Sequence, residues 1–103
     1  MRFMISFRMP TDKGNQLIRE GKLGETIQSI MEDLKPEAVY FTDVDGDRGG
    51  YLIVNMDHAS ELPALLEPLF QTLDATIQVN VVLTPEDLQR ASPTLEQAVQ
   101  KYS

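Results

Sequence analysis

The spacing of apolar residues switches repeatedly between strand-like and helix-like along this sequence, and the order of the switches constrains the fold most strongly. Residues 2–9 alternate apolar and more polar side chains, which is typical of a strand with one face on a core. Residues 38–42 and 51–56 are rich in β-branched and aromatic side chains, and residues 77–83 alternate again. The sequence therefore predicts four strands.

A first helix is predicted between the first two strands. Apolar residues recur with helical spacing over residues 17–34, and a Lys-Pro pair ends the pattern. Gly21 and Gly24 lie on or beside this stripe, where each weakens a helix by roughly 1 kcal/mol relative to alanine. We therefore expect a kink, a break or unusually close packing at these glycines.

A second helix is predicted over residues 62–73, which carry the most regular helical stripe of the chain. Asp57 or Ser60 is expected to cap its start, with Pro63 in its first turn. Pro68 is expected to bend or shorten this helix.

The tail, residues 84–103, contains two N-cap and proline pairs. Thr84-Pro85 and Ser92-Pro93 each place a capping hydroxyl before a proline at the first helical position. Two short helices are therefore predicted to finish the chain.

The predicted order is strand, helix, strand, strand, helix, strand, which is the α+β arrangement called ferredoxin-like. Right-handed crossovers place both helices on one face of a four-stranded antiparallel sheet. The Gly-rich residues 43–50 suit a hairpin loop between the second and third strands. Because the other face of the sheet is left bare and only partly polar, we expect a homodimer, or a higher even-numbered assembly, that covers it.

Composition limits the domain count and the classes of partner. A chain of 103 residues closes one core, so we expect a single domain over residues 1–103. The formal charge of −7, from 16 acidic and 9 basic residues, argues against nucleic acid and against an anionic membrane. The chain has no cysteine, and its apolar N-terminal stretch is too short for a signal or membrane segment, so a cytoplasmic location is expected.

Several segments resemble the dimeric α/β barrel superfamily. The similarity is carried by the strand order and by residues 3–7, 35–41 and 66–70. A Thr-Pro-Glu-Asp-Leu tail at residues 84–88 is similar to the branch that resembles muconolactone isomerase. This resemblance implies a ferredoxin-like dimeric barrel, and the superfamily includes cofactor-free isomerases and small monooxygenases. No cofactor is therefore expected.

The strand alternation divides the sheet residues between two faces. The core-facing set is Phe3, Ile5, Phe7, Met9, Val39, Phe41, Leu52, Val54, Ile77, Val79 and Val81. The opposite set is Arg2, Met4, Ser6, Arg8, Tyr40, Thr42, Tyr51, Ile53, Asn55, Gln78 and Asn80. This second set mixes hydroxyl, amide, aromatic and guanidinium groups, which is a lining that suits a small polar organic ligand.

Five residues of the bare face are candidate ligand-binding residues: Arg8, Tyr40, Tyr51, Asn55 and Asn80. A guanidinium holds a carboxylate in a bidentate pair, and a tyrosine hydroxyl donates to a carbonyl or enolate oxygen. The alternative is that these groups satisfy one another across a dimer interface, where Tyr and Arg are enriched. A second location stays open, between the sheet and the helices, where Gly21 and Gly24 leave room.

His58 and Tyr40 are the candidate catalytic residues. His58 is the only histidine and follows the third strand, where an imidazole suits a general base; a water-facing residue at a helix start is the alternative. Two functions therefore remain open at this point. The first is a homodimer that binds a small organic molecule or mainly assembles, and the second is a cofactor-free isomerase or monooxygenase acting on a small cyclic or aromatic compound.

The hairpin contains an Asp43-x-Asp45-Gly46-Asp47 cluster, which resembles part of a calcium loop. An EF-hand also needs an acidic residue at its twelfth position, and this chain has an apolar residue there, so we expect a hairpin turn and no metal site. Arg48 in the same hairpin is a candidate for reaching an anion in the partner subunit, although a charged turn residue is more often solvated.

Overall fold

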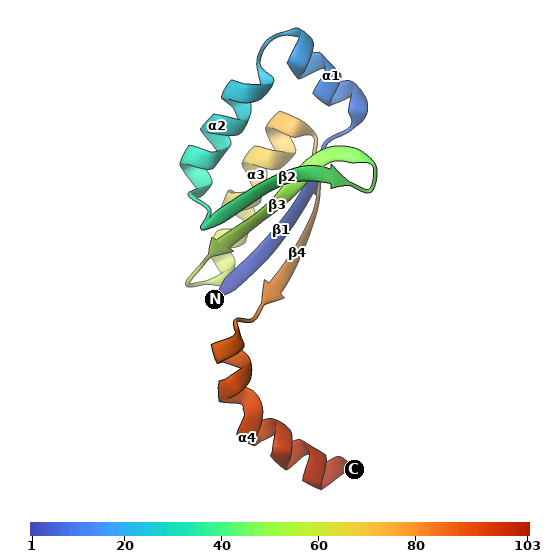
Figure 1. Cartoon of the computed structure of the whole chain (residues 1–103). Helices are drawn as coiled ribbons and strands as arrows, with labels where there is room; N and C mark the ends of the chain where they lie inside the picture. Colours follow the sequence, from blue (N-terminus) through green and yellow to red (C-terminus); the bar gives the residue numbers. More distant parts are fainter.

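A computed structural model describes the whole chain, residues 1–103. The elements are β1 (Arg2–Arg8), α1 (Thr11–Arg19), α2 (Leu23–Leu34), β2 (Ala38–Val44), β3 (Asp47–Asn55), the 3-10 turn η1 (Ala59–Glu61), α3 (Leu62–Leu73), β4 (Thr76–Val82) and α4 (Pro85–Tyr102) (Figure 1). The strand order is β2-β3-β1-β4, and every neighbouring pair is antiparallel. The βαββαβ order predicted from the spacing of apolar residues is therefore confirmed.

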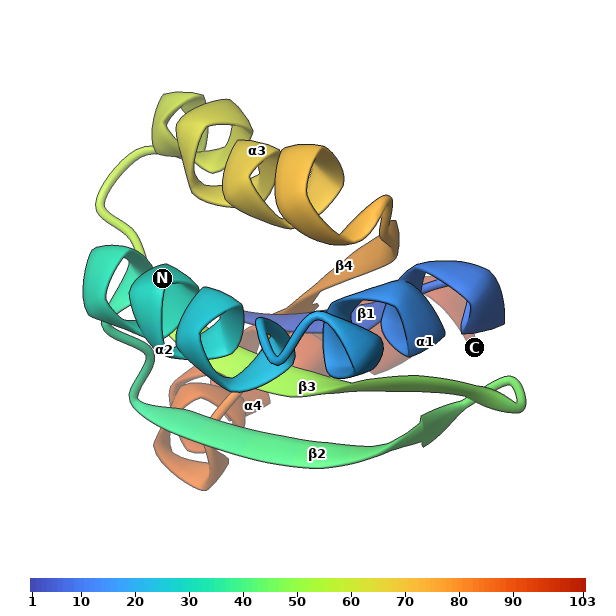
Figure 2. The same cartoon turned by 90° about the horizontal axis from the view of Figure 1, so that it is seen from above.

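The sheet has one covered face and one open face. Figure 2 shows α1, α2 and α3 on the same side of the sheet. The pairing register places Ile5 beside Leu52 on one side and beside Val79 on the other, so their side chains share the covered face. The 13 buried apolar residues that form the core are Phe3, Ile5, Phe7, Met9, Leu17, Ile30, Leu34, Leu52, Val54, Met56, Leu69, Leu73 and Ala75.

Two residues predicted for the core are exposed instead. Phe41 and Val81 lie on the covered face by register, yet each is 58% exposed. Phe41 lies in the middle of β2 and Val81 lies near the end of β4, and these two strands are the edges of the sheet. The alternation fixes the face of a strand residue, but the helices do not fully cover the two edge strands of that face.

The first predicted helix is two helices, and the break lies at Gly21. Helix α1 ends at Arg19 and α2 begins at Leu23, and Gly21 adopts a φ of +67°. A glycine enters this left-handed region without the steric cost that a Cβ would impose. Gly24 lies inside α2 and does not interrupt it, so only one of the two expected glycines breaks the helix.

The hairpin between β2 and β3 is much shorter than the predicted loop of residues 43–50. β2 continues to Val44 and β3 begins at Asp47, which leaves only Asp45 and Gly46 in the turn. Their φ angles are +50° and +87°, as the favoured two-residue hairpin turns require. The other two glycines of this segment therefore lie within β3.

The entry into α3 differs from the predicted cap. The Glu61 carboxylate accepts hydrogen bonds from the backbone N–H groups of Asp57, at 3.0 Å, and His58, at 2.9 Å. Neither Asp57 nor Ser60 caps α3, because the chain enters through η1 and Glu61 satisfies the free N–H groups from inside that turn. Pro63 lies in the first turn as predicted, and α3 continues past Pro68 to Leu73.

The tail forms one helix of 18 residues, so the prediction of two short helices is wrong. Thr84 is its N-cap as predicted: the Thr84 hydroxyl accepts from the Asp87 backbone N–H at 3.2 Å. Pro93 lies inside α4, where it removes its own backbone hydrogen bond while the turns on either side remain bonded. Neither α4 nor any other helix of the structure has the length and apolar character needed to cross a membrane.

The capping box at the start of α4 gives a pH prediction. The Thr84 backbone N–H donates to the Asp87 carboxylate at 3.0 Å, and this bond is the largest cause that lowers the pKa of Asp87 below its ordinary 3.8. Partial desolvation opposes the shift, while the Thr84 hydroxyl, Arg90 and Arg2 reinforce it. Because the folded-state pKa is depressed, the cap stabilises α4 above pH 3.8 and loses this effect as the pH falls through the folded value.

An NMR titration of the Asp87 side chain measures this shift. We expect its midpoint below 3.8 in the natural chain and closer to 3.8 in Thr84→Ala, which removes the hydroxyl. Thr94→Ala, in the middle of α4, is the control and should leave the midpoint unchanged. The same Asp87 midpoint in both variants would contradict the role assigned to the Thr84 hydroxyl.

Candidate functional site

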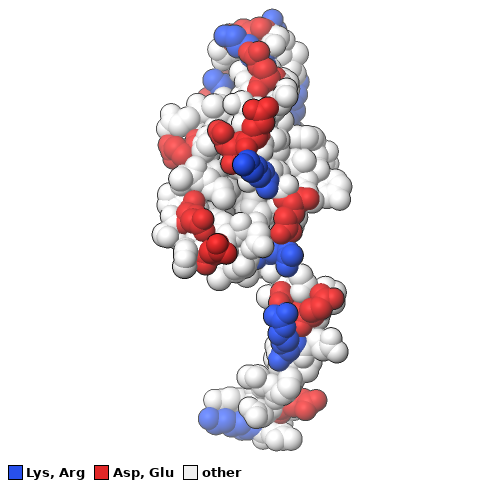
Figure 3. Space-filling model, turned by 90° about the vertical axis from the view of Figure 1, so that its left-hand side faces the viewer, with Lys and Arg blue, Asp and Glu red and all other residues white.

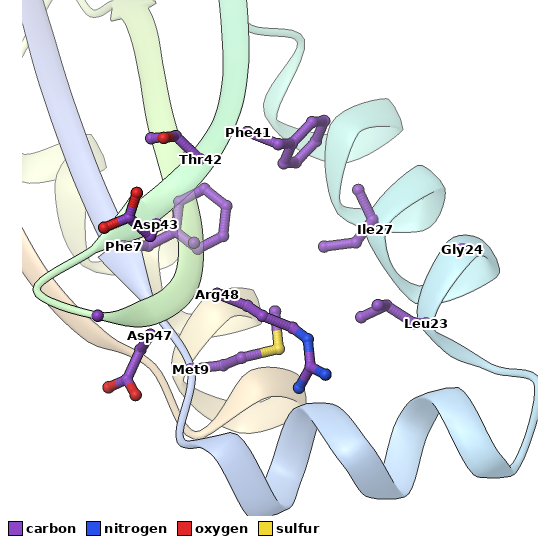
Figure 4. A pocket seen from close by; sticks show the side chains of 12 residues that line it. Phe7, Met9, Leu23, Gly24, Ile27, Phe41, Thr42, Asp43, Asp47 and Arg48 are labelled. Carbon is purple, nitrogen blue, oxygen red and sulfur yellow. The ribbon is translucent and has the colours of Figure 1, made fainter.

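A cavity of about 650 Å³ lies at the hairpin end of the sheet, on the covered face, between the β2–β3 hairpin and α2 (Figure 4). Its volume lies within the range of small-molecule sites, roughly 300 to 1,000 Å³. Its lining residues are Phe7, Met9, Leu23, Gly24, Ile27, Phe41, Thr42, Asp43, Gly46, Asp47, Arg48 and Gly49.

Apolar side chains form most of the wall. Phe7 and Met9 come from the end of β1, Leu23 and Ile27 from α2, and Phe41 from β2. The Phe7 and Phe41 rings pack edge to face, with centroids 6.5 Å apart and an interplanar angle of 85°. Such a wall favours a flat apolar ring over a strongly hydrated ligand.

Arg48 supplies a cation to this apolar wall. In Figure 4 its side chain extends across the cavity between Met9 and the start of α2. Its backbone carbonyl accepts from the Met9 N–H at 2.9 Å, which joins the beginning of β3 to the end of β1. No carboxylate lies within 4.0 Å of its guanidinium, although Asp43 is its register partner on β2. Arg48 is therefore an ion-pairing group without an ionic partner.

The acidic residues of the hairpin do not converge on one point. Asp47 accepts from the Arg8 guanidinium at 2.7 Å, and Asp45 lies 3.9 Å from the same guanidinium. Asp43 pairs in register with Arg48 and belongs to the covered face, and its carboxylate takes part in no ion pair. The cavity thus offers one free guanidinium and one free carboxylate.

The five ligand-binding candidates from the sequence lie outside this cavity, on the open face. Tyr40 and Tyr51 are direct register partners, so the structure brings these two together. Arg8 is held by Asp47, and Asn55 accepts from the N-terminal ammonium group at 3.1 Å at the opposite end of the sheet. Asn80 lies on the edge strand β4 opposite Met4. Their proposed role in ligand binding stays a prediction.

His58 is also remote from the cavity. It is exposed, lies directly before η1, and is not among the residues that line the cavity. Tyr40, the other predicted catalytic residue, is 69% exposed on the open face. Of the two glycines expected to leave room between sheet and helices, Gly24 lines the cavity, whereas Gly21 forms the break between α1 and α2.

Sequence reasoning underrated Arg48 and Asp43, which the register places on the covered face together with Phe41. The signal was present in the alternation, because continuing β2 and β3 toward a two-residue turn assigns Asp43 and Arg48 to the face that carries Phe41. The predicted hairpin loop was too long, and this removed the two charged residues from the sheet.

Gly14 of α1 limits the position of Arg48, and this gives a prediction. A Cβ built on Gly14 would lie 2.7 Å from a guanidinium nitrogen of Arg48, which is closer than packed atoms allow. Because that nitrogen ends a flexible side chain, Gly14→Ala is expected to move the guanidinium without unfolding the protein, and the helix gains up to about 1 kcal/mol. We expect unchanged or raised thermal stability together with altered Arg48 side-chain NMR shifts. Unaltered shifts would contradict this packing.

Comparison with known proteins supports the fold. No family model matches the sequence, and no curated protein matches it. The chain is similar to a solved structure of 5-chloro-2-hydroxyhydroquinone dehydrochlorinase from Burkholderia phenoliruptrix AC1100 in complex with 2,5-dihydroxybenzoquinone, with a TM-score of 0.59 and 19% identity over 84% of this chain and 97% of that chain. It also matches the de novo designed protein Ferredog-Diesel, with a TM-score of 0.45 and 12% identity over 79% of this chain and 85% of that chain. The dehydrochlorinase likeness and the observed strand order show that this protein has a ferredoxin-like α+β fold.

Proposed function

We propose that this protein binds a small acidic aromatic or quinoid compound in the cavity between the β2–β3 hairpin and α2. The observation that carries the proposal is the unpaired Arg48 guanidinium on an otherwise largely apolar wall. A guanidinium beside an apolar surface recognises a ring that bears an anionic oxygen, because it forms charge-assisted hydrogen bonds while the ring packs on the wall.

The dehydrochlorinase comparison supplies a probe for this proposal. That protein was solved with 2,5-dihydroxybenzoquinone, a flat ring with acidic hydroxyl groups. A ring of this kind suits the Phe7 and Phe41 wall, and its anionic oxygen suits Arg48. We therefore choose 2,5-dihydroxybenzoquinone as the test ligand, and hydroquinone, which has a similar ring but stays neutral at pH 7, as its control.

Calorimetric titration tests the proposal, and NMR shift mapping locates the binding. We expect saturable binding of 2,5-dihydroxybenzoquinone and at least roughly tenfold weaker binding of hydroquinone, since a charge-assisted bond contributes about 1.5 to 3 kcal/mol. The shifts should concentrate on Gly24, Phe41 and Arg48. Shifts confined to Tyr40 and Tyr51 would instead support a site on the open face, and the absence of binding at millimolar ligand would end the proposal.

A second candidate function is cofactor-free proton transfer on such a ring, as in an isomerase or a small monooxygenase. The observation that favours it is the free Asp43 carboxylate beside the cavity, which is a group of the type that serves as a general base. In this mechanism Asp43 moves the proton, which is the catalytic role that the sequence analysis predicted for His58 or Tyr40. Turnover that disappears in Asp43→Asn while ligand binding persists would support it, and full turnover in that variant would exclude it.

The open sheet face supports a further part of the proposal, a homodimer. Its mixed apolar and polar surface would be buried between two copies. On sequence resemblance we propose that the chain belongs to the dimeric α/β barrel superfamily and to its muconolactone isomerase-like branch. A cytoplasmic location is part of the same proposal and rests on the absence of cysteine.

A further inference from the structure

Helix α4 projects from the body of the molecule, and no other part of the chain covers it. None of its 18 residues is buried, and the whole structure is 60 Å long but only 27 × 20 Å across (Figures 1 and 3). Only Leu83 separates the end of β4 from the N-cap Thr84, so little chain is free to turn the helix back onto its own sheet. The side chains of α4 are therefore accessible to another molecule.

One side of α4 carries apolar residues with a strict heptad spacing. This α4 stripe, in which the intervals alternate between three and four residues, consists of Leu88, Ala91, Leu95, Ala98 and Tyr102. Such intervals keep the same side of a helix turned toward a second helix along its whole length. Leu88, Leu95 and Tyr102 are each more than half exposed. The α4 stripe therefore has the pattern of a helix that pairs with another helix.

The opposite side of α4 is polar and contains Pro93. The other residues on that side are Gln89, Arg90, Glu96, Gln97 and Gln100. In the heptad that begins at Leu88, Pro93 occupies the sixth position, which faces away from a partner helix. A proline inside a helix clashes with the carbonyl one turn earlier and disturbs the helix on its own side. Pro93 therefore lies where it does not interfere with contacts along the α4 stripe.

Large and small residues alternate along the α4 stripe, and this alternation suits an antiparallel pair of identical helices. Leu88, Leu95 and Tyr102 are large, whereas Ala91 and Ala98 are small. When two antiparallel copies of α4 overlap along their whole length, Leu88 of one helix lies opposite Ala98 of the other, and Leu95 lies opposite Ala91. Each leucine then fills the space beside an alanine, so the two helices can approach closely.

Charged residues beside the α4 stripe favour the same alignment. Asp87 and Lys101 directly precede the stripe residues Leu88 and Tyr102, so both lie on the same flank of the stripe. In the antiparallel pair, Asp87 of each helix lies beside Lys101 of the other helix, which gives two contacts between opposite charges. Parallel helices would gather both Asp87 side chains at one end and both Lys101 side chains at the other. Charge complementarity therefore selects the antiparallel direction.

We propose that α4 forms an antiparallel pair with α4 of a second copy of this chain, and that the two α4 stripes face each other. The pair is self-complementary, as a two-fold contact requires, because the same residues meet from both helices. It uses no part of the open sheet face, which is left to the homodimer of the proposed function. A chain with two different two-fold contacts builds an assembly larger than a dimer, and a tetramer is its smallest closed form. The size of the assembly rests on that homodimer, whereas the helix pair does not.

The area of the contact indicates that two helix pairs act together. A contact about 27 Å long and 10 Å wide buries roughly 540 Å² when both helices are counted, which is well below the lower limit of about 1,200 Å² for stable specific interfaces. Two such pairs between two homodimers bury roughly 1,100 Å², which is close to that limit. We therefore expect α4 to join chains that are already paired through their sheets.

Sedimentation equilibrium of variants on the two sides of α4 tests the helix pair. We expect the natural chain to form a tetramer and Leu95→Asp to dissociate to a dimer at the same concentration, because its carboxylate meets the apolar stripe of the second helix. Gln97→Asp adds the same charge on the polar side of α4 and should remain a tetramer. Circular dichroism melting confirms that each variant is folded before its assembly is measured.

The outcomes of this experiment distinguish the helix pair from the homodimer. Equal assembly size in the natural chain and in Leu95→Asp would overturn the helix pair, and a dimer in both would leave the homodimer in place. A natural dimer that becomes a monomer in Leu95→Asp would support the helix pair and overturn the homodimer through the sheet face. A monomeric natural chain would overturn both contacts.

Cysteine cross-linking tests the direction of the helix pair. The natural chain has no cysteine, so a double variant with Leu88→Cys and Ala98→Cys carries only the two introduced thiols. In the antiparallel pair, position 88 of one chain lies opposite position 98 of the other, whereas parallel helices would join position 88 to 88 and position 98 to 98. Within one helix the two positions are about 15 Å apart, too far for a disulfide inside the chain.

Peptide mapping after mild oxidation identifies which positions are joined. We expect disulfides between position 88 of one chain and position 98 of another. The matched control is the double variant Gln89→Cys with Gln97→Cys, whose thiols have nearly the same spacing but lie on the polar side of α4, and it should stay unlinked. No linkage between positions 88 and 98, or equally fast linkage in the control, would overturn the antiparallel pair.

Discussion

Arg48→Ala is expected to weaken binding of 2,5-dihydroxybenzoquinone by roughly 10- to 100-fold, with no loss of fold. The variant removes the unpaired guanidinium of the cavity, and a hydrogen bond to a charged group contributes about 1.5 to 3 kcal/mol. No ion pair of the folded protein is lost, because Arg48 forms none. Isothermal titration calorimetry measures the affinity, and thermal melting checks the fold.

Two further variants distinguish the effect of the planar guanidinium geometry of Arg48 from the effect of its positive charge. Arg48→Lys keeps the positive charge but loses the planar fork, so its affinity should fall between those of the natural chain and Arg48→Ala. Arg90→Ala removes the same charge from the exposed surface of α4 and should bind as the natural chain does. If Arg48→Ala and Arg90→Ala bind equally well, Arg48 does not hold the ligand.

Gly50→Ala is expected to reduce the free energy of unfolding by about 3 kcal/mol, which is a large share of the stability of a small domain. A Cβ on Gly50 would overlap the backbone carbonyl oxygen of Tyr40 and lie 3.2 Å from the Cα of Phe41 on the neighbouring strand. Backbone atoms inside a hydrogen-bonded sheet cannot move aside as a side chain does, so β2 and β3 must separate locally. Urea denaturation followed by circular dichroism measures the change.

Gly24→Ala is the matched control for this prediction. Gly24 is a glycine inside α2 with no atom within 4 Å of a built Cβ, so the added methyl group meets open space. Alanine is also the better helix former, and we expect stability equal to that of the natural chain or up to about 1 kcal/mol higher. A Gly50→Ala protein as stable as Gly24→Ala would show that the β2–β3 pair tolerates the methyl group.

The order of elements and most of the core were predictable from the sequence, because local periodicity records which side of an element is buried. Phe3, Ile5 and Phe7 alternate in β1, and Leu69 and Leu73 recur with helical spacing in α3; all five are buried. These patterns are properties of consecutive residues. They need no knowledge of distant parts of the chain.

The predicted boundaries failed where a residue type is compatible with more than one local structure. Ser92-Pro93 matches a helix start, yet it lies in the middle of α4. Pro93 removes only its own backbone hydrogen bond, and the other turns of the 18-residue helix remain bonded. Gly49 and Gly50 match a loop, yet they lie in β3. Glycine is needed at these two strand positions because the backbones of the neighbouring strands lie too close to leave room for a side chain. In both places the surroundings select one of two allowed conformations.

The position of the candidate site could not be predicted from the sequence, because it depends on how much of the sheet the helices cover. The sequence assigned Phe41 to the covered face, but whether a helix covers the β2 edge of that face depends on the direction of α1 and α2 after the break at Gly21. Arg48 became a candidate binding residue because the register placed it on this uncovered part and left it without an ionic partner. Neither fact is encoded in local periodicity.

By itself, the sequence determined the sheet-and-helix order, the inward face of each strand, the N-cap at Thr84 and the exclusion of cysteine chemistry. Only the tertiary structure decided the position of the cavity, the unpaired state of Arg48 and the projection of α4 away from the sheet. The physical reason is range: alternation, caps and turns depend on residues a few positions apart. Cavities and unpaired charges depend on how elements distant in sequence meet in space.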